Sequence, residues 1–161
     1  MQGSFLPILP VQFIFFGEAA SVYGGNKLCA ATSASAGLDL RACLPAGESI
    51  RIAPGERHML HTGIGIEVML SGVAGFVFSR SGLGALKGLT VAQGVGIIDA
   101  DYRGEITVPL LNTSSQAYDV TRGERIAQLV FLPYFTPQFI EVKELGATER
   151  GHGGFGHTGA F

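Results

Sequence analysis

Cysteine and histidine are too few in this sequence to build a metal framework. The 161 residues include two cysteines, Cys29 and Cys43, and four histidines. The cysteines are not spaced as Cys-x-x-Cys and no pair of histidines stands at a ligand spacing, which argues against a structural zinc site. We expect two free thiols in a reducing compartment, with a disulfide as the open alternative.

Charge and long apolar runs are also scarce. Charged residues make up 15% of the chain and the formal net charge is −2, so we expect no non-specific nucleic-acid binding. An anionic substrate would need a local cationic site or a metal ion. Pro7, Pro10 and Gln12 interrupt the most apolar stretch before it reaches membrane-spanning length. The first basic residue is Lys27, whereas a secretory signal starts with a charged region. We expect a cytoplasmic protein without membrane contact.

The composition is instead that of a turn-rich β protein. Hydrophobic residues make up 47% of the chain, and its 24 glycines follow no collagen period. Turn signals recur about every ten residues, which predicts an all-β sandwich or barrel in one domain. The predicted strands are Val11–Phe16, Leu38–Cys43, Ser49–Ile52, His58–Leu60, Ile64–Leu70, Val73–Phe78, Val91–Ile98, Glu105–Leu111, Ala117–Thr121, Arg125–Leu132 and Gln138–Val142.

Individual segments of the sequence also predict burial, turns and a C-terminal tail. Val11–Phe16 is apolar throughout, so we expect it to be buried on both faces. Gly17–Asn26 reads as a loop. Gln93-Gly94 indicates a tight hairpin, and Pro109 an edge strand or a bulge. We expect helical turns only within 79–88. The core pattern stops near residue 145, which predicts a body of residues 1–145 and a mobile C-terminal tail, 146–161.

The stretch Gly96–Glu105, GIIDADYRGE, is the strongest candidate for chemistry. Asp99 and Asp101 directly follow an apolar strand, where burial can tune a carboxylate as a base. The alternative is a surface turn, in which Asp and Gly belong for backbone reasons. An EF-hand is excluded, because Arg103 and Leu110 occupy ligand positions.

Three further segments carry polar groups with two interpretations each. Ser79–Gly88 offers Arg80, hydroxyls and glycine amides that suit phosphate oxygens, or it is an ordinary glycine-rich turn. Asp39, in an alternating strand, faces a cation or solvent. Gln128, in an apolar strand, satisfies backbone groups or points at a ligand.

The C-terminal tail contains a literal G-x-G-x-x-G match at 151–156. A dinucleotide site needs a strand before this motif and a helix after it, and neither is present, so the match is false. The tail is a frayed terminus, or it closes over a ligand, with Arg150 pairing with phosphate and Phe155 stacking on a base.

The order of these segments is more specific than any one of them. AGLDLRA (36–42), SRSGLGALKG (79–88), GVGIIDADYRGE (94–105), RGERIAQLVF (122–131) and RGHGGFGHTG (150–159) resemble, in order, the five motifs of the trimeric dUTP pyrophosphatases. The resemblance covers the chain from about residue 31 onward. It implies a distorted jelly-roll β fold, a homotrimer with three active sites at subunit interfaces, and Mg²⁺-assisted hydrolysis of dUTP to dUMP and pyrophosphate.

The resemblance also implies residue roles. Asp99 matches the general base that activates water, and Tyr102 matches the aromatic residue against the deoxyribose. Asp39 matches a carboxylate that holds Mg²⁺ through water. The remaining matches are the base-reading segment with Gln93, Gly94, Val95 and Ile98, the base-covering Phe155, and the phosphate-contacting Arg80, Ser81, Gly82, Gln128, Arg150, Gly153 and Gly154.

Two positions depart from the family pattern, Ser79 in place of proline and Gln93 in place of asparagine. Ser79 should matter little, whereas Gln93 bears on uracil recognition. The nearest rival is a dCTP deaminase of the same superfamily, but its glutamate base matches Pro109 here, which cannot act as a base. The other alternative is a non-catalytic nucleotide-binding regulator.

Overall fold

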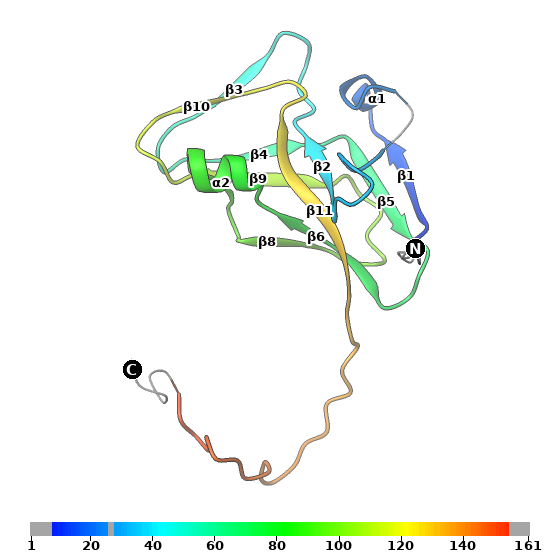
Figure 1. The fold of residues 1–161 in the computed structure, drawn as a ribbon, viewed down its shortest axis with the longest axis vertical. Coiled ribbons are helices and arrows are strands. Elements are labelled where there is room, and N and C mark those ends of the chain that lie inside the picture. The colour runs from blue at the N-terminus through cyan, green and yellow to red at the C-terminus, as the bar shows by residue number, and fades with distance from the viewer. Residues whose placement is uncertain (1–7, 26–27, 155–161) are drawn as a thin grey trace, which may run out of the picture.

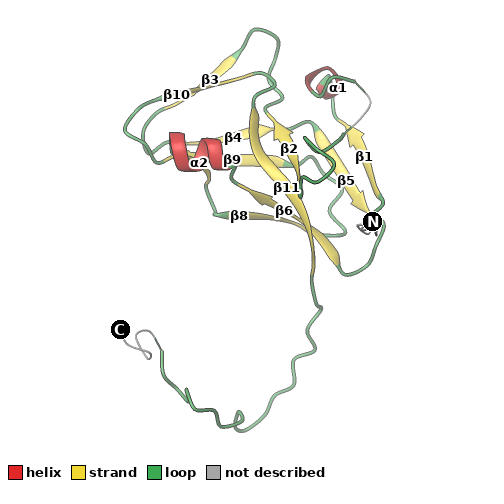
Figure 2. Ribbon diagram, in the orientation of Figure 1, coloured by secondary structure: helices red, strands yellow, loops and turns green. Residues whose placement is uncertain are grey.

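The computed structural model describes residues 8–25 and 28–154. In chain order the elements are β1 Val11–Phe15, α1 Ala19–Val22, β2 Gly37–Arg41, β3 Ser49–Ile52, β4 Arg57–His61, β5 Ile64–Val68, β6 Val73–Phe78, α2 Ser81–Lys87, β7 Leu89–Val91, β8 Val95–Ile98, β9 Thr107–Asn112, β10 Tyr118–Thr121 and β11 Arg125–Pro133. Figures 1 and 2 show strands wrapped into one body, with α2 on its surface. The all-β prediction is confirmed.

The strands form small antiparallel sheets around a common core. Their orders are β2-β11-β6-β8, β4-β9-β7, β1-β5 and β10-β3. Along strand β9, buried residues alternate with partly exposed ones. One face of the strand is therefore available to pack on the core. Val108 and Leu110 point into the core, where they join Leu129 of β11 and Val77 of β6. Burial of each such side chain contributes about 1.5–3 kcal/mol.

The N-terminal region differs from the sequence-based expectation. β1 is a strand but is not buried on both faces, because among the described strands it pairs with β5 alone, at the outside of the body. Phe13 and Ile14 are 36% and 54% exposed. The predicted loop 17–26 contains the short helix α1, whose Ala19 is buried. The thiols of Cys29 and Cys43 are free, as expected.

The turn at Gln93-Gly94 exists but does not make a hairpin. The Gly94 N–H donates to the Val91 carbonyl at 2.9 Å. The strands on either side then pair with different partners, β7 with β9 and β8 with β6, so the chain passes from one sheet to another at this turn. A tight turn therefore does not by itself specify which strands pair.

Pro109 marks neither an edge nor a bulge. It lies in β9, the central strand of its sheet, opposite Met59 of β4. Proline lacks an N–H but keeps its carbonyl, which here accepts a hydrogen bond from the Ala92 N–H at 2.8 Å. The strand tolerates Pro109 because β7 ends at Val91, one residue before this contact.

The predicted strand Gln138–Val142 is wrong. β11 ends at Pro133, and the last backbone contact to the body runs from the Tyr134 N–H to the Gly72 carbonyl. The chain then leaves the body without a strand partner (Figure 1), and Phe139 is 91% exposed. A strand needs a neighbour for its backbone groups, and this segment finds none within the described chain. No helix in the described residues is long and apolar enough to cross a membrane.

Substitutions at Gly63 and Gly47 test how tightly α1 packs on the turn that contains Gly63. Both adopt positive φ, +70° and +80°, but a Cβ on Gly63 would overlap Ala19, whereas a Cβ on Gly47 would meet nothing within 4 Å. We expect Gly47→Ala to lower the free energy of unfolding by about 1 kcal/mol, from backbone strain alone. Gly63→Ala should cost roughly 1–3 kcal/mol more, from overpacking. Urea denaturation at one protein concentration measures both, and equal losses would contradict the packing of α1 on this turn.

Candidate functional site

One cavity lies where β8 ends and the chain turns toward β9. It has a volume of about 230 Å³ and is called the Asp99 cavity here. It brings together four predicted site residues, Gln93, Ile98, Asp99 and Tyr102. Gly94 and Val95 are adjacent in the chain but do not line it. Its lining residues are Val77, Val91, Gln93, Gly96, Ile97, Ile98, Asp99, Tyr102, Glu105, Ile106, Thr107 and Pro109.

The walls of the Asp99 cavity differ in character. Val77, Val91 and Ile106 are almost completely buried and line an apolar part. Asp99 and Gln93 supply polar groups. An apolar pocket with a few convergent polar groups is the usual form of a small-molecule site. The cavity can therefore enclose a ring beside a carboxylate.

The loop between β8 and β9 is fixed by its own hydrogen bonds. The Tyr102 N–H donates to the Asp99 carbonyl at 3.1 Å, and the Tyr102 hydroxyl donates to the Glu105 carbonyl at 2.8 Å. Gly104 has no side chain because a Cβ there would overlap the Tyr102 ring. The Arg103 guanidinium donates to the Ala100 carbonyl at 2.8 Å and to the Glu67 carboxylate of β5 at 2.7 Å. These contacts hold the loop in one conformation, but it is still a surface turn, because Asp99, Asp101 and Tyr102 are exposed. The burial that could tune Asp99 as a base is therefore not found in the described chain.

A second cavity, of about 320 Å³, lies beside β2 and the start of α2 and is called the Arg80 cavity. It collects five predicted residues, Asp39, Arg80, Ser81, Gly82 and Gln128. The lining residues are Ala31, Ser35, Ala36, Gly37, Asp39, Arg80, Ser81, Gly82, Arg125 and Gln128.

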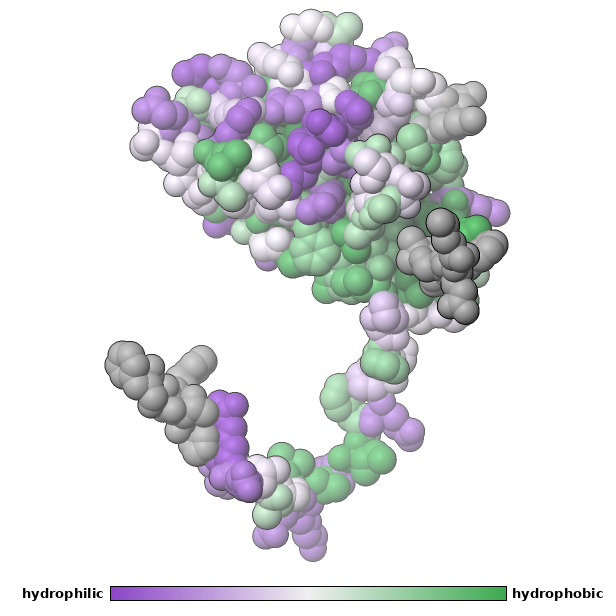
Figure 3. All heavy atoms as spheres, in the orientation of Figure 1, coloured by the Kyte–Doolittle hydropathy of each residue, from purple (hydrophilic) through white to green (hydrophobic). Residues whose placement is uncertain are grey.

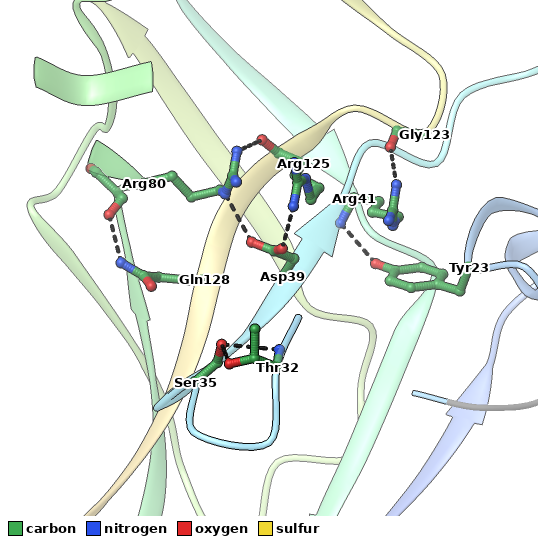
Figure 4. Close-up of polar contacts among 10 residues, drawn as sticks. Tyr23, Thr32, Ser35, Asp39, Arg41, Arg80, Gly123, Arg125 and Gln128 are labelled. Atoms are coloured by element: carbon green, nitrogen blue, oxygen red, sulfur yellow. Dashed lines mark hydrogen bonds and ion pairs between the residues drawn. The ribbon is translucent and has the colours of Figure 1, made fainter. Parts of the chain in front are cut away.

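Asp39 is held by two cations in this cavity (Figure 4). Its Oδ1 accepts a hydrogen bond from Arg80 Nε at 2.8 Å, and its Oδ2 from Arg125 Nη1 at 3.2 Å. Arg80 Nη1 also donates to the Arg125 carbonyl at 3.1 Å. Of the two interpretations of Asp39, the structure therefore supports the one in which it faces a cation. Two guanidinium groups against one carboxylate leave an excess positive charge, which favours an anionic ligand.

Gln128 and Ser79 join the strands beside this cavity. Gln128 Nε2 donates to the Ser79 carbonyl at 3.1 Å, so the amide satisfies a backbone group while it also lines the cavity. The Ser79 hydroxyl accepts a hydrogen bond from the Val91 N–H at 2.8 Å. Ser79, which departs from the family pattern, thus connects the end of β6 to β7.

Contacts at the end of α2 hold this helix against β10. Lys87 Nζ donates to the Tyr118 hydroxyl at 2.9 Å, and that hydroxyl donates to Glu124 Oε1 at 2.6 Å. Burial, and then the hydrogen bond to Glu124, raise the pKa of Tyr118 above its ordinary value. The hydrogen bond to Tyr118 raises the pKa of Lys87. Ser81 and Gly82 therefore stand on a helix that is fixed at its other end.

The two cavities do not merge within one chain. They share no lining residue. Asp39 pairs with Gln128, Gln128 with Phe78 and Phe78 with Val95, in a row across the sheet β2-β11-β6-β8. Asp39 lies on one edge strand, and Asp99 follows the other. Three strand spacings separate these edges by about 14 Å.

The predicted residues of the C-terminal tail lie away from both cavities. Arg150 Nε donates to the Gly153 carbonyl at 2.9 Å, and Arg150 Nη2 to the Gly154 carbonyl at 3.2 Å, so these three residues form a local turn. None of them lines either cavity. Phe155 lies outside the described residues.

Sequence reasoning missed two of the charged residues that line these cavities, Arg125 and Glu105. Strict alternation along β11 would place Arg125 and Gln128 on opposite faces of the sheet. A register shift between Arg125 and Ala127 changes this alternation, and both side chains line the Arg80 cavity. Glu105 gave no signal beyond its place in a strand pattern.

Comparisons with known proteins agree on one family. A family model described as dUTPase matches residues 25–159. The deoxyuridine 5'-triphosphate nucleotidohydrolase of Desulfitobacterium hafniense is 49% identical over 129 residues, which cover 80% of this chain and 84% of that protein. The enzyme of the same name from Hydrogenovibrio crunogenus is 48% identical over 130 residues, which cover the same shares of the two chains.

Solved structures share the fold. The Staphylococcus bacteriophage 80alpha dUTPase with dUPNHPP superposes with a TM-score of 0.77 at 25% identity, over 93% of this chain and 98% of that chain. A mutant dUTPase from phage phi11 of S. aureus, which shows the coordination of a structural Mg(II) ion, has a TM-score of 0.71 at 21% identity, over 86% and 99%. The predicted jelly-roll fold is confirmed.

The pairing of Asp39 with two arginines can be tested against an exposed ion pair. Asp39→Asn removes the charge from a carboxylate side chain that is 21% exposed. We expect it to lower the free energy of unfolding by about 1–2 kcal/mol, since hydrogen bonds to charged groups are the stronger ones. The control, Asp119→Asn, breaks the Arg51–Asp119 pair, whose side chains are 69% and 51% exposed. It should cost less than about 0.5 kcal/mol. Urea denaturation compares the two, and equal losses would show that Asp39 is not held as described.

Proposed function

The chain belongs to the dUTPase family, and from this premise we propose that Asp99 is the general base with which it hydrolyses dUTP. The protein is a dUTP diphosphatase. One observation supports the assignment most directly. Asp99 and Tyr102 stand together at a cavity with an apolar part, whereas the arginines gather in a separate cationic cavity. A nucleotide needs both environments, one for its base and sugar and one for its phosphates.

The Asp99 cavity takes the uracil and the deoxyribose. Tyr102 packs against the sugar and leaves no room for a 2′-hydroxyl. The segment Gln93–Ile98, with Gly94 and Val95, reads the uracil edge through its backbone. This edge presents acceptor, donor and acceptor in turn, so cytosine would leave buried groups unpaired, which discriminates strongly. Phe155 covers the base.

The Arg80 cavity takes the triphosphate. Arg80, Ser81, Gly82 and Gln128 contact its oxygens, and Arg80 contributes the charge that attracts them. From the tail, Arg150 clamps the γ-phosphate, with the amides of Gly153 and Gly154 beside it. The tail thereby closes the site, excludes bulk water and releases the product when it opens.

A magnesium ion fits this set of donors only through water. Asp39 is the carboxylate of the Arg80 cavity, and both of its oxygens already accept hydrogen bonds from arginines. Mg²⁺ keeps several waters and binds through one or two carboxylates together with substrate phosphates. Asp39 would therefore hold its water shell, and the ion would neutralise charge on the phosphates.

In the reaction, Asp99 takes a proton from a water molecule that attacks the α-phosphorus. The P–O bond to the β-phosphate breaks, and dUMP and pyrophosphate leave. General-base catalysis of this kind contributes about 10²–10⁴-fold in rate. The arginines reduce the negative charge that would otherwise repel the base and the attacking oxygen. In the cell, where we place the enzyme in the cytoplasm, this reaction limits uracil incorporation into DNA and supplies dUMP for dTMP synthesis.

The separation of the two cavities supports a homotrimer with shared sites. One chain cannot bring Asp99 to a phosphate chain in its own Arg80 cavity across the sheet, but neighbouring copies can bring the two cavities together. The segment after β11 supports association as well, because Phe135, Phe139 and Leu145 are 93%, 91% and 88% exposed. Apolar residues recur along this segment in Figure 3. Exposed apolar residues of this size favour contact with another protein surface.

Product analysis tests the function. The protein is incubated with dUTP, dCTP and UTP, each with Mg²⁺ or with a chelator. We expect dUMP and pyrophosphate from dUTP alone, lost on chelation. Ammonia from dCTP would indicate the deaminase instead, although Pro109 lines the Asp99 cavity where that enzyme needs a glutamate. Binding of dUTP without turnover would indicate a regulator.

Asp99→Asn tests the base, because the amide keeps the shape of the side chain but cannot accept the proton. We expect dUTP binding to persist while the turnover number falls at least about 10²-fold. The control is Asp101→Asn, an exposed neighbour outside the cavity lining, which should turn over dUTP normally. Near-normal turnover by Asp99→Asn would refute the assignment.

Mixed trimers test the sharing of sites. Asp99→Asn and Arg80→Ala proteins, each of low activity, are unfolded together, refolded and assayed with dUTP. If each site combines the Asp99 cavity of one copy with the Arg80 cavity of another, mixed trimers contain intact sites and activity returns. An Arg150→Ala protein, mixed in the same way with the Asp99→Asn protein, should also restore activity if the tail acts on another copy. No gain in either mixture, with sedimentation showing mixed trimers, would place each site within one chain.

A further inference from the structure

A side-chain contact from Glu105 joins the loop that carries Asp99 and Tyr102 to the turn before β5. Glu105 Oε1 accepts a hydrogen bond from the Gly63 N–H at 2.7 Å. Its Oε2 lies 2.9 Å from Nδ1 of His61. The Glu105 side chain is 23% exposed, whereas that of His61 is 65% exposed. The contact with Gly63 is therefore the more sheltered of the two.

Backbone contacts reinforce this junction on both sides of Glu105. The Ile106 N–H donates to the Ile64 carbonyl at 2.8 Å. The hydroxyl of Thr62, which is completely buried, donates to the Ile106 carbonyl at 2.6 Å. The turn 62–64 and the start of β9 thus form one unit.

The N-terminal segment fixes the position of Gly63. The Phe16 N–H donates to the Gly63 carbonyl at 2.9 Å, and Ala19 packs directly against the Gly63 α-carbon. β1 pairs with β5 from Val11 opposite Val68 to Phe15 opposite Ile64. The amide of Gly63 is therefore held in a fixed position toward Glu105, and this gives residues 11–19 a role.

Glu105 in turn supports the tyrosine of the loop. The Tyr102 hydroxyl donates to the Glu105 carbonyl, and the Tyr102 N–H to the Asp99 carbonyl. A displacement of Glu105 would move the acceptor that orients the Tyr102 ring. Both carboxylate oxygens of Glu105 are engaged, so it is not a second base in the Asp99 cavity.

We propose that Glu105 is a positioning residue that sets the selectivity for deoxyribose over ribose, through its contact with the Gly63 amide and its support of Tyr102. This rests on the proposed role of Tyr102 at the sugar. Selectivity depends on how closely the ring approaches the 2′-carbon, and a misplacement of about 1 Å in a site can cost 10²-fold. A loosened ring would admit UTP.

The experiment compares kcat and KM for dUTP and UTP in the full-length protein. Glu105→Ala removes both contacts and should lower the ratio of kcat/KM for dUTP over UTP roughly 10-fold or more. Glu105→Gln keeps an amide oxygen that accepts from Gly63 and should hold the ratio within about 3-fold. Glu105→Asp keeps the charge but is one methylene shorter, so it should lower the ratio even if the alanine variant folds poorly.

Two controls separate the parts of the proposal. His61→Ala removes only the exposed partner and should leave the ratio unchanged. Glu48→Ala removes a carboxylate on an exposed turn, and should leave all constants unchanged. A purely structural role would lower activity on both substrates alike or reduce thermal stability without moving the ratio.

The proposal is overturned if Glu105→Ala and Glu105→Asp keep the wild-type ratio, if Glu105→Gln is as impaired as Glu105→Ala, or if His61→Ala reproduces the loss. Wild-type protein that hydrolyses both nucleotides equally would overturn it together with the role of Tyr102. Wild-type protein that hydrolyses neither would refute the proposed function itself, which the same assay reports separately.

Discussion

The sheet β2-β11-β6-β8 determines where the chemistry of this protein can take place. Its hydrogen-bond register ties Asp39 on one edge to Gln128, and through Phe78 to Val95 on the other edge. The cationic cavity and the cavity with the apolar part are thereby kept a fixed distance apart within one chain. A rigid sheet cannot fold back to join its own edges, so the proposed binding of one nucleotide to both environments requires a second copy of the chain.

The positive charges of the site gather at one edge of this sheet. The chain carries a formal charge of −2, yet two arginines converge on Asp39 at the edge of the sheet. The carboxylate holds the guanidinium groups in place before any ligand arrives, so little ordering remains to be done on binding. Preorganised donors of this kind are worth more than flexible ones, because they do not have to reorganise as charge develops.

Much of this organisation was readable from the sequence, and the exceptions have physical causes. Alternation predicted β9, because a strand with one buried face leaves that pattern. Strand prediction failed for Gln138–Val142, where β-forming residues have no partner strand within the described chain. The predicted burial of β1 on both faces was also wrong. Apolar residues show that a surface favours burial, but they do not show which element covers it. Arg125 escaped notice because a register shift, which no local pattern announces, carries it to the face of Gln128.

The apolar residues left exposed along the segment after β11, and on β1, bear on how this protein behaves in dilute solution. Phe135 and Phe139 gain little burial when the single chain folds, and Ile14 on the outer strand β1 stays about half exposed. Any stabilisation they contribute comes from association, and by mass action it grows with protein concentration. In the proposed homotrimer, the melting temperature would therefore rise with the protein concentration at which it is measured.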